Sequence, residues 1–118
     1  MAEIKPIQTD DYHISYDNET TTISCKGALR LSGMDEYEPI VHLFNEVADM
    51  KLPLIYFDLK ELKFLNSSGI NVLSKFVIRV RQKKTVDMVL QGSNKIPWQG
   101  KSLKNLQRLM PTLTLELE

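Results

Sequence analysis

The sequence predicts a single α/β domain on a mixed sheet, with the element order β-β-α-β-α-β-α-β, an antiparallel edge hairpin and helices packed on the sheet. Three observations support this prediction. Residues 54–59 form a nearly unbroken apolar and aromatic run, which indicates a buried strand. Apolar residues at helical spacing follow it from Ile70 and precede it at 37–48. Strands that alternate with helices imply parallel crossovers, which are right-handed by default.

The amino-terminal part predicts a lead-in and then the hairpin. Residues 1–11 are polar and contain Pro6, so we expect a loosely held segment before a single domain over residues 12–118. The alternating pattern of a strand appears at 12–16 and again at 20–28. Turn-forming residues at 17–19 separate the two stretches, which together predict a β-hairpin.

The first helix is predicted by a stripe of apolar residues at helical spacing. Its members are Tyr37, Ile40, Val41, Phe44, Val47 and Ala48. Pro39 lies among them, and proline is tolerated only in the first turn of a helix. We therefore expect the helix to begin near Asp35 or Glu36 and to end before Pro53.

The central unit is predicted to be a strand, a short connection and a helix. The run at 54–59 predicts a strand covered on both faces, with 60–65 as a spacer. The polar tetrapeptide at 66–69, Asn-Ser-Ser-Gly, consists of good helix N-caps, so the helix is expected to begin on its two serine hydroxyls. The buried stripe of this helix is expected to be Ile70, Leu73, Phe76, Val77 and Val80.

The carboxyl-terminal part adds a strand, a helix and a last strand. Alternation at 85–90 predicts a third buried strand. Ser102 is expected to cap the last helix, with Leu103, Leu106, Leu109 and Met110 facing inward. Alternation at 112–117 predicts the final strand.

Composition disfavours several classes of protein. The chain has 118 residues, which is enough for one core, and 15 basic against 15 acidic residues give no net charge. Nucleic-acid binders normally carry a basic excess, so no nucleic-acid partner is expected. The first dozen residues lack the apolar segment of a signal peptide, no apolar run approaches the ~20 residues that span a bilayer, and Cys25 is the only cysteine. We expect a cytoplasmic protein without membrane insertion.

The junction at residues 66–69 is the predicted position of the chemistry. It follows the central strand, at the sheet edge where ligands of α/β proteins gather. A helix N-terminus accommodates an anion, so a phosphate on a serine there would be stabilised locally. The alternative is that Asn66 and Ser67 only cap the helix.

The central motif resembles that of the STAS domains, which occur in anti-sigma factor antagonists and sulfate transporter tails. The similarity consists of Phe57-Asp58-Leu59, a spacer, the run Phe64-Leu65-Asn66-Ser67-Ser68-Gly69-Ile70 and an apolar helix. The predicted order of elements agrees over residues 12–117, so the resemblance covers almost the whole chain.

The resemblance implies a binding module that joins its partner when unphosphorylated and releases it when modified. Ser67 matches the serine that partner kinases phosphorylate, Ser68 the neighbouring hydroxyl residue, and Gly69 the glycine that lets the helix start close to the sheet. The family aspartate is Asn66 here, which can still cap a helix but supplies no negative charge. The implied partners are an anti-sigma-type serine/threonine kinase and an opposing phosphatase.

The predicted binding surface is the exposed start of the central helix, at Asn66, Ser67, Ser68 and Gly69. Asn71 and Lys75 lie one helical turn apart and are expected to extend it. Two alternatives are a phosphorylation-independent adaptor that uses the same surface and a sensor that binds an anion or small ligand at the helix start. The oligomeric state is not predicted.

No enzymatic activity, cofactor or metal is expected. The G-x-S-x-G, Walker and G-x-G-x-x-G patterns are absent, and His13 and His42 lack neighbours at metal-ligand spacing. Cys25 is expected in the core. Trp98 is either a lid on the core or a partner anchor. Basic residues near the end of the central helix form either a solvated helix end or a docking patch: Arg79, Arg81, Lys83 and Lys84.

Overall fold

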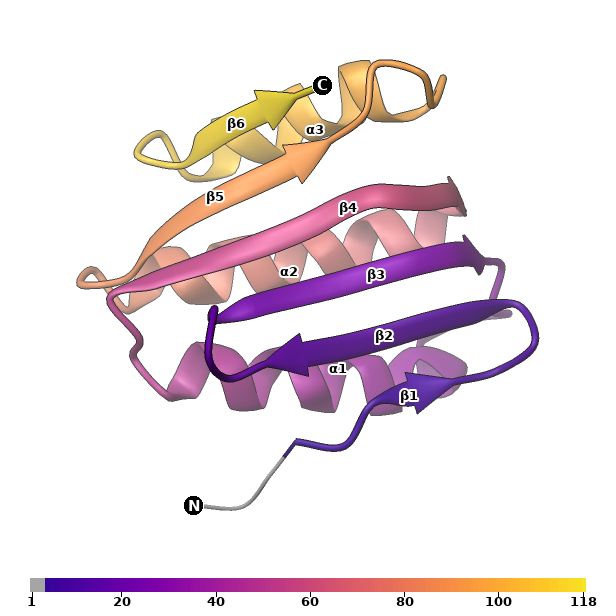
Figure 1. The fold of residues 1–118 in the computed structure, drawn as a ribbon, viewed down its shortest axis with the longest axis horizontal. Helices are drawn as coiled ribbons and strands as arrows, with labels where there is room; N and C mark the ends of the chain where they lie inside the picture. Colours follow the sequence, from indigo (N-terminus) through magenta and orange to yellow (C-terminus); the bar gives the residue numbers. More distant parts are fainter. Residues whose placement is uncertain (1–3) are drawn as a thin grey trace.

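The computed structural model describes residues 4–118, which form a mixed six-stranded sheet with three helices packed on it (Figure 1). This is the fold class that the sequence predicts. The elements in chain order are β1 (Ile7–Gln8), β2 (Tyr12–Asp17), β3 (Thr22–Leu29), α1 (Met34–Asp49), β4 (Leu54–Leu65), α2 (Ser67–Gln82), β5 (Asp87–Gly92), α3 (Gln99–Leu109) and β6 (Thr114–Leu117).

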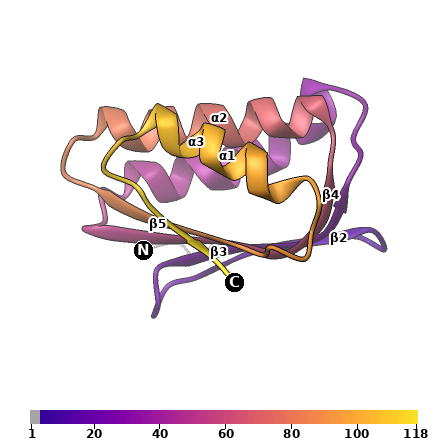
Figure 2. The same ribbon diagram turned by 90° about the horizontal axis from the view of Figure 1, so that it is seen from above.

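The strands lie in the sheet in the same order as in the sequence, from β1 to β6. The pairs β1–β2 and β2–β3 are antiparallel, and the pairs from β3 to β6 are parallel. Each parallel connection passes through one helix, and all three helices cover the same face of the sheet (Figure 2). This follows from topology, because crossovers of one hand that progress in one direction place their helices on one side. No helix of the described residues lies on the opposite face.

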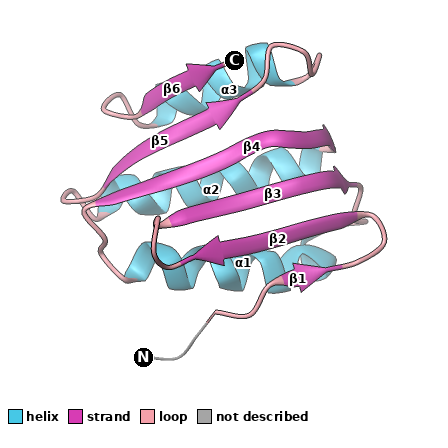
Figure 3. Ribbon diagram, in the orientation of Figure 1, coloured by secondary structure: helices cyan, strands magenta, loops and turns pink. Residues whose placement is uncertain are grey.

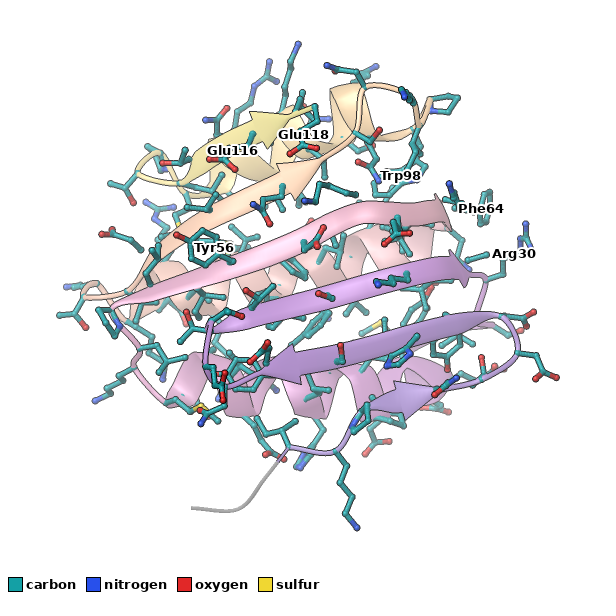
Figure 4. The ribbon with its side chains drawn as sticks, in the orientation of Figure 1. Arg30, Tyr56, Phe64, Trp98, Glu116 and Glu118 are labelled. Carbon is teal, nitrogen blue, oxygen red and sulfur yellow. The ribbon has the colours of Figure 1, made fainter. Side chains whose placement is uncertain are left out.

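The expectation that the central strand is covered on both faces is wrong. Ile55, Phe57 and Leu59 are fully buried beneath the helices, but the intervening Tyr56 and Asp58 are only half-buried on the helix-free face. Figure 4 shows Tyr56 on that face. Leu54, which also belongs to the apolar run, is likewise only half-buried.

The central strand is also longer than expected. Residues 60–65, predicted to be a spacer, continue β4 beside β3 as far as the Leu29–Leu65 pair, with register shifts along the way. The pairing with β5 ends at Asp58. The far half of β4 therefore has a strand neighbour on one side only.

Two helices begin earlier than expected. The first helix begins at Met34, where the Tyr37 N–H donates to the Gly33 carbonyl at 3.3 Å, so Pro39 lies beyond the first turn. Proline has no N–H, and the Asp35 carbonyl consequently lacks its usual helical donor. The last helix begins at Gln99, so Ser102 lies inside it and is not its cap.

Part of the predicted lead-in forms a strand, which the sequence does not predict. Residues Ile7 and Gln8 form β1, with Ile7 opposite Ile14 and Gln8 opposite His13. Ile7 thereby lies against the edge of the core. Residues 1–3 of the predicted lead-in lie outside the described residues. The helices and strands of the described part are distinguished in Figure 3.

The core lies between the sheet and its helices. Its centre is a group of three phenylalanines, one each from α1, β4 and α2: Phe44, Phe57 and Phe76. Their ring centroids are 4.9–5.4 Å apart. Cys25 is a fully buried core residue, as predicted. Leu43 is buried although the predicted stripe omits it, whereas Val41 and Ile70 are half-buried.

We expect Phe57→Ala to lower the free energy of unfolding by about 3–5 kcal/mol, because it leaves a cavity between α1 and α2. The matched control is Phe64→Ala in the same strand, where the ring is 40% exposed and the loss should be below about 1 kcal/mol. Urea unfolding measures both values. If Phe57→Ala fails to fold, Phe57→Leu should still cost more than Phe64→Ala. Equal losses at the two positions would contradict the packing described here.

Candidate functional site

The start of α2 is capped by Asn66. The Asn66 backbone is extended, and its Oδ1 accepts a hydrogen bond from the Gly69 N–H at 2.9 Å. The expectation that the helix begins on the serine hydroxyls is therefore wrong: the amide of Asn66 satisfies the free backbone donor instead. This leaves the hydroxyl of Ser67 without a capping role.

Asn66 also joins α2 to two other parts of the chain. The Tyr37 hydroxyl of α1 donates to Asn66 Oδ1 at 2.7 Å, and Asn66 Nδ2–H donates to the Leu31 carbonyl, just after β3, at 2.8 Å. The Asn66 backbone N–H donates to the Leu29 carbonyl at 3.2 Å. An aspartate would keep the acceptor but lose the Nδ2–H donor and place a second oxygen against the Leu31 carbonyl.

Tyr37 is suited to its role as a donor. The residue is fully buried, and burial raises the pKa of its hydroxyl above the usual value near 10. The hydroxyl therefore stays protonated at physiological pH and can donate to Asn66. α1 is in this way fixed against the first turn of α2.

Gly69 is required by the close approach of α2 to the sheet. A Cβ at this position would clash with Leu65 Cδ1 and would lie 2.7 Å from the Tyr37 hydroxyl oxygen. The residue is buried. The role that the resemblance implied for Gly69 agrees with this geometry.

The predicted site residues separate into two groups. Ser67, Asn71 and Lys75 are exposed at successive four-residue steps, so they form one stripe along α2. Ile78, which is 38% exposed, extends the stripe. Asn66 and Gly69 instead face inward, and Ser68 is half-buried. The accessible part of the candidate surface is therefore the Ser67–Asn71–Lys75 stripe.

An exposed aromatic residue near this stripe was missed at the sequence level. Phe64, at the end of β4, is 40% exposed, and the Arg30 guanidinium carbon lies 4.8 Å from its ring centroid. Figure 4 shows both side chains at the carboxyl-terminal edge of β3 and β4. The sequence predicts a spacer at residues 60–65, so it does not predict that Phe64 lies on this edge of the sheet.

Trp98 and Gln99 cover the part of β4 that β5 leaves unpaired. The Trp98 indole N–H donates to the Leu62 carbonyl at 3.0 Å. The fully buried Gln99 donates through Nε2 to the Leu59 and Leu62 carbonyls at 2.6 and 3.0 Å, and its Oε1 accepts from the Ser93 N–H at 2.7 Å. Trp98 thus acts as a lid on the core. No local pattern in the sequence predicts the role of Gln99, because its partners Leu59 and Leu62 are distant in the chain.

Most of the basic residues at the end of α2 make contacts within the fold. Arg79 Nη2 lies 2.8 Å and Lys83 Nζ 2.9 Å from the Asp49 carboxylate at the end of α1. Hydrogen bonds from both cations lower the pKa of Asp49 to about 2, so this carboxyl group is ionised at physiological pH. Arg81 donates to the Leu109 carbonyl at 3.2 Å. These three residues connect α2 to α1 and α3.

Other side chains with reactive groups include Cys25 and His42. Burial raises the pKa of the Cys25 thiol. His42 is exposed on α1, and its Nε2 lies 2.7 Å from the Glu46 carboxylate. Within residues 4–118, no group of three or more His, Cys, Asp or Glu residues is arranged to hold a metal ion. None of the helices in this range has the length and apolar character needed to cross a membrane.

No family model matches the chain, and neither does any curated protein. A solved structure does match it: the crystal structure of the diguanylate cyclase SiaD in complex with its activator SiaC, from Pseudomonas aeruginosa. The similar chain is the activator, with a TM-score of 0.72, 13% identity, and coverage of 97% of this chain and 99% of that chain. The likeness establishes the fold. It agrees with the STAS-like arrangement predicted from the sequence.

We expect Gly69→Ala to destabilise the protein by at least about 1–3 kcal/mol, because the added methyl group clashes with Leu65 and Tyr37. Gly100→Ala is the matched control: it lies inside α3 and nothing lies within 4 Å of the added Cβ. Alanine there should be neutral or stabilise the protein by up to about 1 kcal/mol. Thermal unfolding measures both, and a tolerated Gly69→Ala would contradict the close packing of α2.

Proposed function

We propose that this chain is a regulated protein–protein interaction module of a signalling pathway, and that it acts without catalysis or a cofactor. The start of α2 docks onto a partner through the Ser67–Asn71–Lys75 stripe. Phosphorylation of Ser67 releases the partner. One observation carries the proposal: Asn66 caps the helix, so the exposed hydroxyl of Ser67 has no capping role.

The electrostatics of the helix start favour this role for Ser67. A phosphate at the first residue of α2 would lie beside the free backbone N–H groups and the positive end of the helix dipole. The modified domain would therefore remain folded. The phosphate would also add nearly two negative charges to the stripe, and removing these charges from water in the interface is costly. The complex should then dissociate.

The proposed partners come from two likenesses. The structural neighbour SiaC is the activator of a diguanylate cyclase and forms a complex with it, so we propose a signalling enzyme as the docking partner of this chain. The resemblance to STAS domains adds an anti-sigma-type serine/threonine kinase that modifies Ser67 and a phosphatase that reverses the modification. The lone, reduced Cys25 fits our proposal that this switch operates in the cytoplasm.

We expect Ser67→Glu to abolish capture of a partner that the wild-type chain and Ser67→Ala both retain from lysates of the protein's own cells. The control is Thr112→Glu, which adds the same charge at an exposed position between α3 and β6. Quantitative mass spectrometry of the captured proteins gives the readout, and phosphosite mapping across growth conditions establishes whether Ser67 is modified.

Two outcomes would overturn the switch. Equal capture by Ser67→Glu and Ser67→Ala would favour the phosphorylation-independent adaptor. A saturable shift of the amide resonances of residues 66–70 on titration with phosphate or nucleotides, without any protein captured, would favour the anion sensor.

A further inference from the structure

An open groove lies on the opposite flank of the molecule from α3, between α1 and the segment that leads into β1. Its volume is about 640 Å³. The apolar part of its wall comes from both sides: Ile4 and Ile7 from the amino-terminal segment, and Pro39 and Leu43 from α1. Figure 1 shows β1 beside α1 at this edge of the sheet. We call this feature the α1 groove.

The α1 groove has an acidic rim. Three carboxylates from α1 line it, those of Asp35, Glu38 and Glu46, against one lysine, Lys5, and His42. The imidazole of His42 faces the Glu46 carboxylate at 2.7 Å. The chain as a whole has no net charge, so this concentration of acids is a local feature.

The same part of α1 contains a backbone acceptor without its helical donor. Pro39 has no N–H, so the carbonyl of Asp35, four residues earlier, lacks its donor within α1. Both residues line the groove. The part of the groove formed by α1 therefore combines hydrogen-bond acceptors with apolar side chains. A ligand that matches it needs both hydrogen-bond donors and apolar side chains.

We propose that the α1 groove binds an amphipathic helix of a partner protein, with an apolar stripe flanked by lysine or arginine. The lining of α1 runs from Asp35 to Glu46, which corresponds to about 17 Å or three helical turns at 1.5 Å per residue. This length suits a helix laid along α1, with apolar anchors at helical spacing in the groove and basic residues against the rim.

Charge argues against a second copy of this chain as the occupant. A symmetric dimer through this groove would bring the same acidic rim from both protomers together. Like charges across an interface are costly, whereas opposite charges accelerate association. This docking site is separate from the Ser67–Asn71–Lys75 stripe, so it goes beyond the function proposed above.

The test uses the complete isotope-labelled chain and a synthetic 14-residue peptide with leucine at helical spacing and lysine elsewhere. We expect saturable shifts of the amide resonances of Ile4, Ile7 and residues 35–38 and 40–46. Two control peptides, one with glutamate in place of lysine and one with alanine in place of leucine, should produce no such shifts. Binding of either control as tightly as the leucine–lysine peptide would overturn the proposal.

The second part of the test compares two pairs of charge-reversing substitutions. Glu38→Lys combined with Glu46→Lys should weaken peptide binding at least tenfold, because the rim becomes basic. Glu116→Lys combined with Glu118→Lys makes the same charge change at the far strand of the sheet, where Figure 4 shows both residues, and should bind as the wild type does. Equal weakening by both pairs would overturn the proposal, as would concentration-dependent shifts in the groove without peptide.

Ser67→Glu should bind the peptide as tightly as the wild-type chain. Peptide binding to the α1 groove and partner capture through Ser67 are therefore separate readouts, and either proposal can fail without the other. A loss of peptide binding in Ser67→Glu would contradict the independence of the two surfaces.

Discussion

The side chain of Asn66 fixes three parts of the fold at one point. Its amide accepts from Gly69 at the start of α2 and from Tyr37 of α1, and it donates to Leu31 just after β3. The Tyr37 hydroxyl also lies 3.3 Å from the Leu29 carbonyl. Polar groups next to the core are costly to leave unmatched. The position of α2 relative to the sheet depends on this small network.

The hydrogen bonds of Asn66 affect both the packing of the core and the surface at the start of α2. With the helix start fixed, Gly69 allows α2 to approach Leu65 closely, and Phe76 can reach Phe44 and Phe57. At the other end of α2, Asp49 of α1 forms ion pairs with Arg79 and Lys83, which are a second connection between α1 and α2. Because Asn66 supplies the cap, Ser67 needs no structural partner. Its side chain is exposed at the first residue of α2.

The sequence predicts most of the architecture but little of how its parts meet. Periodicity identifies the helices and strands because it reports burial directly, and the polar tetrapeptide marks the start of α2. Periodicity cannot distinguish one covered face from two in a run such as 54–59, because Leu54 and Tyr56 belong to the run although both are only half-buried. Gln99 and Asn66 act through tertiary hydrogen bonds to residues about 30–40 positions away, which no local pattern encodes. The sequence predicts Pro39 in the first turn of α1, but it lies further along the helix, because the packing of α1 outweighs one lost helical hydrogen bond.

The most direct test of this account is a double-mutant cycle between Tyr37→Phe and Asn66→Ala, followed by urea unfolding. If the two side chains act through one hydrogen-bonded network, the double variant should be less destabilised than the sum of the single variants, with a coupling energy of about 0.5–3 kcal/mol. A coupling energy near zero would mean that Asn66 does not connect α1 to the start of α2, and the account of how the site is held would be wrong.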